Sequence, residues 1–141
     1  MTYQAKSAAR WLFTALLLGA SAMLSYEGFA GTMQPPIPPG AQLGSWYDNG
    51  HGGRYVLQVI EGQIPATGWR VAGVVKSDTD CEPDAQGLNH CHNAIELSNG
   101  RRITVIDTHQ MMRNRCLAPG DRISLSAIGP SWLVGTLSGK P

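Results

Sequence analysis

Residues that could bind a metal or act as nucleophiles gather in two stretches of the chain. The first stretch, SDTDCEPDAQGLNHCH, holds Cys81, His90, Cys91 and His92, and the second holds His109, Met111, Met112 and Cys116. Sulfur and imidazole are ligand types that suit copper or zinc. The chain has no C-x-x-C and no H-x-x-x-H spacing, however. We therefore predict no metal site and no cofactor.

The first stretch is also acidic, which invites comparison with a calcium-binding loop. An EF-hand loop needs glycine at its sixth position and a bidentate glutamate at its twelfth. Counted from Asp78, the sixth position is Pro83, and no glutamate stands at the twelfth. This pattern excludes an EF-hand.

A disulfide is the simplest chemistry for Cys81 and Cys91, because these two cysteines flank a polar loop. Disulfides are typical of exported proteins. Closing a ring of this size would stabilise the fold by roughly 2.5–3 kcal/mol. The third cysteine leaves a Cys91–Cys116 bond as the alternative. We favour Cys81–Cys91, which leaves Cys116 as a buried thiol.

Two further patterns are typical of catalysis, and both are incomplete. Cys116 and His109 could form a nucleophile–base pair, but nothing in the sequence supplies an orienting group or an oxyanion site. The His51-Gly52-Gly53 turn is similar to an oxyanion motif, yet no strand-then-helix context accompanies it and no G-x-S-x-G elbow occurs. We predict that the protein is not an enzyme.

The clearest structural element in the sequence is a predicted β-hairpin around Ser98-Asn99-Gly100, which would help to position these residues. A three-residue loop with its glycine in the left-handed conformation pairs Ile95 with Ile103. Glu96 then faces Arg102 on the opposite side as a cross-strand ion pair. This register places all the alternating apolar residues on one face, and a slip of one residue would break the set. The set comprises Ile95, Leu97, Ile103 and Val105.

The run THQMMRNRC, which follows Asp107, loses this alternation and predicts one or two helical turns. Pro119-Gly120 ends the run, and apolar residues alternate again along a new strand from Ile123. Three motifs therefore succeed one another: a Glu-Leu-x-Asn-Gly hairpin, a Met-rich basic turn that ends near Asn, and a Gly-Asp-Arg strand opening. They comprise Glu96, Leu97, Asn99, Gly100, Thr104, Met111, Asn114, Gly120, Asp121 and Arg122.

With these motifs, roughly residues 69–137 resemble bacterial translation initiation factor one, a small OB-fold barrel of the S1 type. The resemblance implies a five-stranded barrel with one short helix between its third and fourth strands. It also implies contacts between basic residues and ribosomal RNA, here Arg113 and Arg122. A basic residue of the family's turn is replaced by Met112 in this chain.

Three other segments predict strands from their Val and aromatic content: Arg54 to Ile60, Trp69 to Lys76 and Ser131 to Leu137. The second corresponds to the first barrel strand of the OB family, with Trp69, Val71 and Val75 facing inward. The first has no counterpart there, and we expect an added edge strand or a cover over one barrel end. The predicted fold of residues 54–141 is all-β, a small five-stranded OB-fold-like barrel with one short helix and an extra N-terminal strand.

Residues 1–30 predict an export signal. Lys6 and Arg10 precede the apolar run from Trp11 to Ala20, and small residues offer cleavage sites after Ala22 or Ala30. The apolar run is shorter than the about 20 residues that a spanning helix needs, although a retained anchor is the alternative. A Pro/Gly-rich linker with turns follows over residues 31–53. We expect a periplasmic or secreted protein with no stable membrane insertion after cleavage.

The net charge of the chain indicates which classes of partner it could attract. The chain has 11 Lys+Arg and 10 Asp+Glu, and loss of Lys6, Arg10 and Glu27 with the signal leaves nine of each. A neutral domain has no general attraction to nucleic acid or to an anionic membrane. We predict a binding or structural module for an unknown protein or small molecule, with nucleic-acid binding as the alternative. The predicted ligand face comprises Glu96, Arg102, Thr104, Arg113, Arg115 and Arg122.

Overall fold

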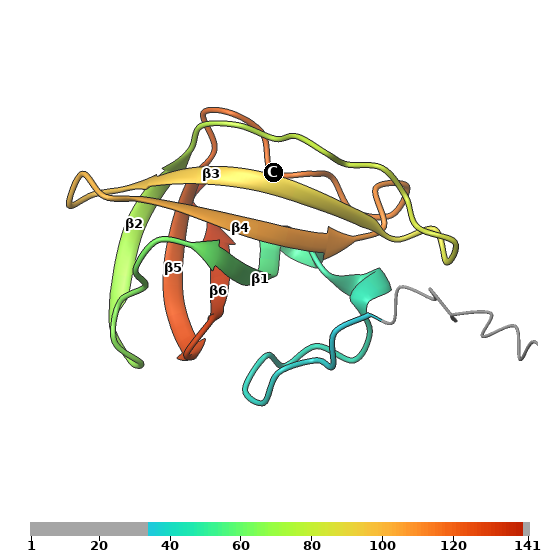
Figure 1. Cartoon of the computed structure of the whole chain (residues 1–141), viewed down its shortest axis with the longest axis horizontal. Coiled ribbons are helices and arrows are strands. Elements are labelled where there is room, and N and C mark those ends of the chain that lie inside the picture. Colours follow the sequence, from blue (N-terminus) through green and yellow to red (C-terminus); the bar gives the residue numbers. More distant parts are fainter. Residues whose placement is uncertain (1–33, 140–141) are drawn as a thin grey trace, which may run out of the picture. The chain divides into compact units, whose positions relative to one another are not determined.

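Six segments in which inward and outward residues alternate form a closed antiparallel β-barrel (Figure 1). The computed structural model describes residues 34–139, so the predicted signal peptide and its cleavage sites lie outside the described residues. The strands are β1 (Arg54–Glu61), β2 (Arg70–Val75), β3 (Asn89–Leu97), β4 (Arg102–His109), β5 (Arg122–Gly129) and β6 (Trp132–Leu137). Their order is β1-β4-β3-β2-β5-β6, and β6 pairs with β1 to close the barrel. The predicted all-β barrel is confirmed, and the barrel is compatible with an OB-like fold.

The β3–β4 hairpin has the predicted register. Ile95 pairs with Ile103, and Glu96 pairs with Arg102. The turn is closed by the backbone N–H of Gly100, which donates to the carbonyl of Leu97. Gly100 has a φ of 81°, in the left-handed region that favours glycine. The four apolar residues of the inward set are all buried.

Strand β1 is a full member of the barrel, so the barrel has six strands rather than five. One edge of β1 pairs with β4 and the other with β6, which makes it neither an edge strand nor a cover. Its two faces are also both apolar, because Tyr55 and Leu57 point into the barrel while Val56 is buried on the outside.

The short helix predicted after the third barrel strand is not formed. Strand β4 instead continues to His109, which pairs with Asn89 at the start of β3. Only a single turn follows, in which the N–H groups of Arg113 and Asn114 donate to the Gln110 carbonyl. The helical elements of residues 34–139 are two 3-10 turns, η1 (Trp46–Asp48) and η2 (His51–Gly53). None of the helices in this part of the chain has the length and apolar character to cross a membrane.

Apolar side chains from all six strands fill most of the inside of the barrel, and buried polar residues of β3 and β4 occupy one end. Val75 is buried and Val71 packs on the core as predicted, and Leu133 is the inward residue of β6. Trp69 is 71% exposed, contrary to the prediction. It precedes the first residue of β2, so the barrel wall does not constrain its direction. The buried core comprises Tyr55, Leu57, Val75, Ile95, Leu97, Ile103, Val105, Leu117, Ile123, Leu125, Ala127 and Leu133.

Residues 34–53, here named the strap, pack on the outer surface of the barrel. Trp46 is buried, and its ring stacks on that of Trp132 with 5.8 Å between centroids. Its indole N–H donates to the carbonyl of Pro35, 2.8 Å away. Ala41 joins the same outer cluster, together with Val56 and Leu88 of the barrel domain. The strap therefore completes a second apolar layer outside β1 and β6.

Candidate functional site

The alternation of β3 sets the chemistry at one end of the barrel. Asn89, Cys91 and Asn93 take its inward positions there, whereas the other end of the strand is filled by apolar residues. The loop before β3 is held against this end because Thr79 forms a β-bridge with His92. This brings Cys81 to Cys91, and the predicted Cys81–Cys91 disulfide is formed. A disulfide fits an oxidising compartment outside the cytoplasm.

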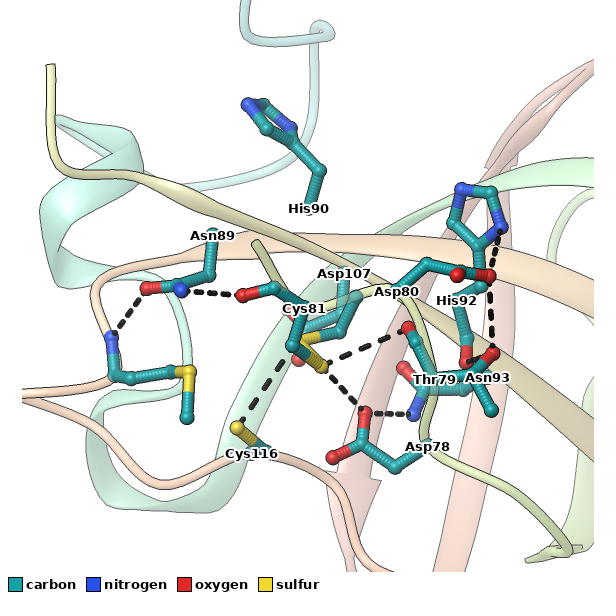
Figure 2. The surroundings of a disulfide bond; sticks show 12 residues. Asp78, Thr79, Asp80, Cys81, Asn89, His90, His92, Asn93, Asp107 and Cys116 are labelled. Atoms are coloured by element: carbon teal, nitrogen blue, oxygen red, sulfur yellow. Dashed lines mark hydrogen bonds and ion pairs between the residues drawn. A yellow bond between two sulfur atoms is a disulfide. The ribbon is translucent and has the colours of Figure 1, made fainter. Parts of the chain in front are cut away.

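The third cysteine and one carboxylate lie beside this disulfide (Figure 2). Cys116 Sγ is 4.0 Å from Cys91 Sγ. Asp78 Oδ1 is 3.2 Å from Cys81 Sγ and accepts a 2.9 Å hydrogen bond from the Asn93 side chain. One ligand atom from each of four residues lies within 4.8 Å of all the others, and we name the set Asp78, Cys81, Cys91 and Cys116 the sulfur cluster.

Cys116 is a protonated thiol at neutral pH. It is half-buried rather than fully buried. Burial raises its pKa to about 11, and the negative charges of Asp78 and Asp107 act in the same direction. Because the thiolate is the reactive form, Cys116 is a weak nucleophile toward the disulfide beside it.

The two histidines of β3 do not belong to the sulfur cluster. His90 and His92 take outward positions on the strand, and Figure 2 shows His90 pointing away from the sulfur atoms. His90 Nε2 lies 2.9 Å from Asp84 Oδ2, and His92 Nδ1 lies 3.6 Å from Asp80 Oδ2. The potential ligands of the first stretch are thus divided between the two faces of the barrel wall.

Asp84 organises the loop that carries Cys81. Its Oδ1 accepts hydrogen bonds from the backbone N–H groups of Gln86 and Leu88, at 2.8 and 3.0 Å. Desolvation opposes ionisation, but these bonds and the one from His90 outweigh it and lower the pKa of Asp84 to about 2. The carboxylate is therefore charged at every physiological pH.

A second polar group inside the barrel was not found from the sequence. Asp107 and His109 are both fully buried, and His109 Nδ1 lies 3.2 Å from Asp107 Oδ2. Burial raises the pKa of Asp107, whereas the pKa of His109 is raised because Asp107 outweighs the opposing effect of burial. The sequence of β4 does contain an indication of this pair, because two polar residues occupy inward positions of the strand and buried polar groups require partners.

Asn49 of the strap supplies part of this partnership. Its Nδ2 donates to Asp107 Oδ1 at 3.2 Å and to the carbonyls of Val56 and Thr108 at 3.0 and 2.8 Å. Its Oδ1 accepts a 2.7 Å bond from the Val56 N–H. One amide side chain therefore links the strap to β1 and β4.

The nucleophile–base pair considered for Cys116 and His109 is not assembled. Asp107 does provide the neighbour for His109 that could not be identified from the sequence. Within residues 34–139, however, no hydrogen bond or ion pair joins His109 to Cys116.

The residues of the predicted ligand face are placed at different ends of the barrel. Arg102 lies 3.5 Å from Glu96 at the β3–β4 hairpin, and Thr104 donates to Glu61. Arg113 and Arg115 lie in the β4–β5 connection, beside the strap and the start of β5. Their acidic neighbours are Asp48, at 3.5 Å from Arg113, and Asp121, which Arg115 binds through both terminal nitrogens at 2.8 and 3.0 Å.

Two of the predicted residues meet across a groove over β2. Val74 pairs with Glu96 on one side and with Arg122 on the other, so these charges flank the same strand. Gly73 allows β2 to lie close to β3, because it has no Cβ. A Cβ at this position would lie only 2.8 Å from Ile95 Cγ2. The groove has a volume of about 460 Å³. Its lining comprises Ala72, Gly73, Val74, Glu96, Leu97, Ser98, Gly100, Arg122, Ile123 and Ser138.

Comparisons of the chain with protein-family models, with curated proteins and with solved structures found no match. The resemblance to translation initiation factor one therefore rests on the hairpin, turn and strand-opening motifs alone.

Removal of the disulfide provides the first test of this end of the barrel. We expect the Cys81→Ala/Cys91→Ala variant to lose about 2.5–3 kcal/mol of unfolding free energy in urea, because its unfolded chain gains loop entropy. Cys116→Ala should cost less, since it removes no cross-link. Peptide mapping without reductant should join Cys81 to Cys91, and a peptide joining Cys91 to Cys116 would contradict this assignment.

Proposed function

We propose that the protein is an exported, non-enzymatic binding module on an OB-like barrel, with its ligand site in the groove over β2. The main support for this proposal is the presence of the groove. Its volume falls within the range of small-molecule sites, roughly 300–1,000 Å³, and Glu96 and Arg122 of the predicted ligand face both line it. The disulfide and the predicted export signal support a location in the periplasm or outside the cell.

The groove has the chemistry to bind a small ligand that carries both charges. Glu96 stands on the β3 side and Arg122 on the β5 side, with Val74 of β2 between them, and the small residues Ala72 and Gly73 continue the groove floor. The backbone groups of β2 are largely used by its neighbours β3 and β5. Recognition would therefore come from the two charged side chains and the apolar floor. A zwitterionic dipeptide or amino-acid-like compound fits this arrangement.

The alternative, binding to nucleic acid, has less support from the positions of the arginines. A nucleic-acid track needs a continuous row of cations that can release counterions from phosphates. Arg102, Arg113 and Arg115 each lie within ion-pair distance of a carboxylate instead. These pairs neutralise the surface locally. We therefore favour a small-molecule or peptide ligand.

A ligand screen with two variants tests the proposal. We expect zwitterionic dipeptides to shift NMR signals of groove residues in the folded protein. Ala72→Phe, at an exposed position on the groove floor, should abolish these shifts by filling the groove. Arg113→Ala/Arg115→Ala, away from the groove, should preserve them.

The same variants distinguish the alternative function. The wild-type protein should bind a mixed-sequence oligonucleotide weakly, and salt should remove this binding. Sub-micromolar oligonucleotide binding at physiological salt, lost in the double arginine variant and kept in Ala72→Phe, would refute the groove as the site of function.

A further inference from the structure

The sulfur cluster assembles four potential metal ligands from three separate segments. Asp78 and Cys81 come from the β2–β3 loop, Cys91 from β3, and Cys116 from the connection between β4 and β5 (Figure 2). Their ligand atoms lie within 4.8 Å of one another although nothing links Cys116 covalently to the others. We propose that, when the Cys81–Cys91 disulfide is reduced, these residues form a tetrahedral Zn²⁺ site with three thiolates and one carboxylate.

Two of the distances between ligand atoms lie close to those of this coordination, one slightly longer and one slightly shorter. Zinc binds thiolate at about 2.3 Å and carboxylate at about 2.0–2.2 Å, which places tetrahedral ligands roughly 3.5–3.8 Å apart. Cys91 Sγ and Cys116 Sγ are 4.0 Å apart, and Cys81 Sγ is 3.2 Å from Asp78 Oδ1. The bonded sulfur atoms of Cys81 and Cys91 must separate, and the remaining edges, none longer than 4.8 Å, must adjust to the metal. Cys81 lies in a loop, where a side-chain rotation can provide this movement.

Residues next to the sulfur cluster hold its ligands in place through hydrogen bonds. Asn93 is buried and holds the Asp78 carboxylate through a 2.9 Å hydrogen bond. Such bonds to ligating groups are a regular part of zinc sites. Arg115 donates to the carbonyl of Cys116 at 2.9 Å and so holds the backbone that carries this ligand. The mixture of three sulfurs with one oxygen suits Zn²⁺ better than a metal that prefers sulfur alone.

Reduction of the Cys81–Cys91 disulfide needs one co-reactant, a dithiol reductant. The dithiol gives two electrons and two protons to the disulfide, forms its own disulfide, and leaves Cys81 and Cys91 as thiols. Zn²⁺ then displaces the protons of the three thiols and binds the thiolates. Disulfide and metal exclude each other, because both use the same two sulfur atoms. The affinity for zinc should also rise with pH, since binding releases protons.

Metal titration of the reduced protein tests the proposal. The mature protein is reduced with dithiothreitol, freed of reductant without oxygen, and titrated with Co²⁺ and then Zn²⁺. We expect one equivalent of Co²⁺ with the intense visible bands of tetrahedral cobalt and a thiolate charge-transfer band, both removed by Zn²⁺. The oxidised protein should bind neither ion. Near-ultraviolet circular dichroism should show a folded barrel in the zinc-bound state.

Matched variants identify the ligands. Cys116→Ser should lose part of the charge-transfer band, and Asp78→Asn should weaken zinc binding at least about tenfold. Asp80→Asn changes a neighbouring exposed carboxylate that lies near His92 instead, and it should bind zinc like the wild type. The proposal is wrong if reduced protein binds less than half an equivalent, if it unfolds and zinc does not restore it, or if Cys116→Ser and Asp78→Asn bind as the wild type does.

Discussion

Replacement of Asn49 by alanine should destabilise the barrel by about 3–6 kcal/mol, because each buried polar group left without a partner costs about 1–3 kcal/mol. Asn49 is fully buried and makes four hydrogen bonds. Its loss would leave the N–H of Val56, the carbonyl of Thr108 and the carboxylate of Asp107 short of partners in a site without room for bulk water. For a domain of this size the melting temperature should fall by roughly 15–30 °C.

Asn99→Ala is the matched control. Asn99 is an exposed asparagine, and its side chain accepts a single bond from the Arg101 N–H at 3.0 Å. We expect a loss below about 1 kcal/mol, because water replaces this bond. Urea unfolding monitored by tryptophan fluorescence measures both variants. Equal losses would show that Asn49 does not link the strap to the barrel energetically.

Gly62→Ala should be the second most damaging change considered for this fold. Gly62 has a φ of 93°. A Cβ there would lie 2.7 Å from the Arg102 carbonyl oxygen and 3.0 Å from the Cα of Ile103. Backbone atoms of β4 cannot move aside as a flexible side chain can. We expect about 1–2 kcal/mol from the left-handed conformation and about 1–3 kcal/mol from the overpacking.

Gly68→Ala separates these two contributions. Gly68 lies in the same β1–β2 connection and has a φ of 89°, but no atom lies within 4 Å of its ideal Cβ position. It should lose only the conformational part, about 1–2 kcal/mol. Thermal unfolding of the two variants under one set of conditions provides the comparison. If Gly68→Ala proves as harmful as Gly62→Ala, close approach of the connection to β4 is not what requires glycine.

The hairpin could be predicted because its information is local. Apolar alternation on both sides of Gly100 leaves one register that buries all four inward residues, and the structure has that register. The disulfide could be predicted for a similar reason, since Cys81 and Cys91 flank one loop. In both cases the partners are near in the chain, and the choice among alternatives is small.

The remaining features depend on partners that are distant in the chain. The strand-like residue pattern of β1 predicts a strand, but it does not indicate that β4 and β6 are the neighbours of that strand. The loss of alternation after Asp107 predicted a helix, whereas pairing with Asn89 extends the strand to His109. Asn49 lies in a turn-rich run that carries no sign of its contacts with Asp107 and Thr108. Asp78 likewise joins the sulfur cluster only through the fold.

Closure of the barrel by its first and last strands also determines when the chain can finish folding. Arg54 at the start of β1 pairs with Thr136 near the end of β6, so the closing contacts join opposite ends of the described domain. Contacts between residues this distant in sequence are slow to form, since a long loop must close before they contribute. β1 leaves the ribosome early and cannot complete its pairing until β6 has been synthesised. In a protein that crosses a membrane unfolded, this delay would keep the nascent chain competent for translocation and postpone barrel closure until the last strand has emerged on the far side.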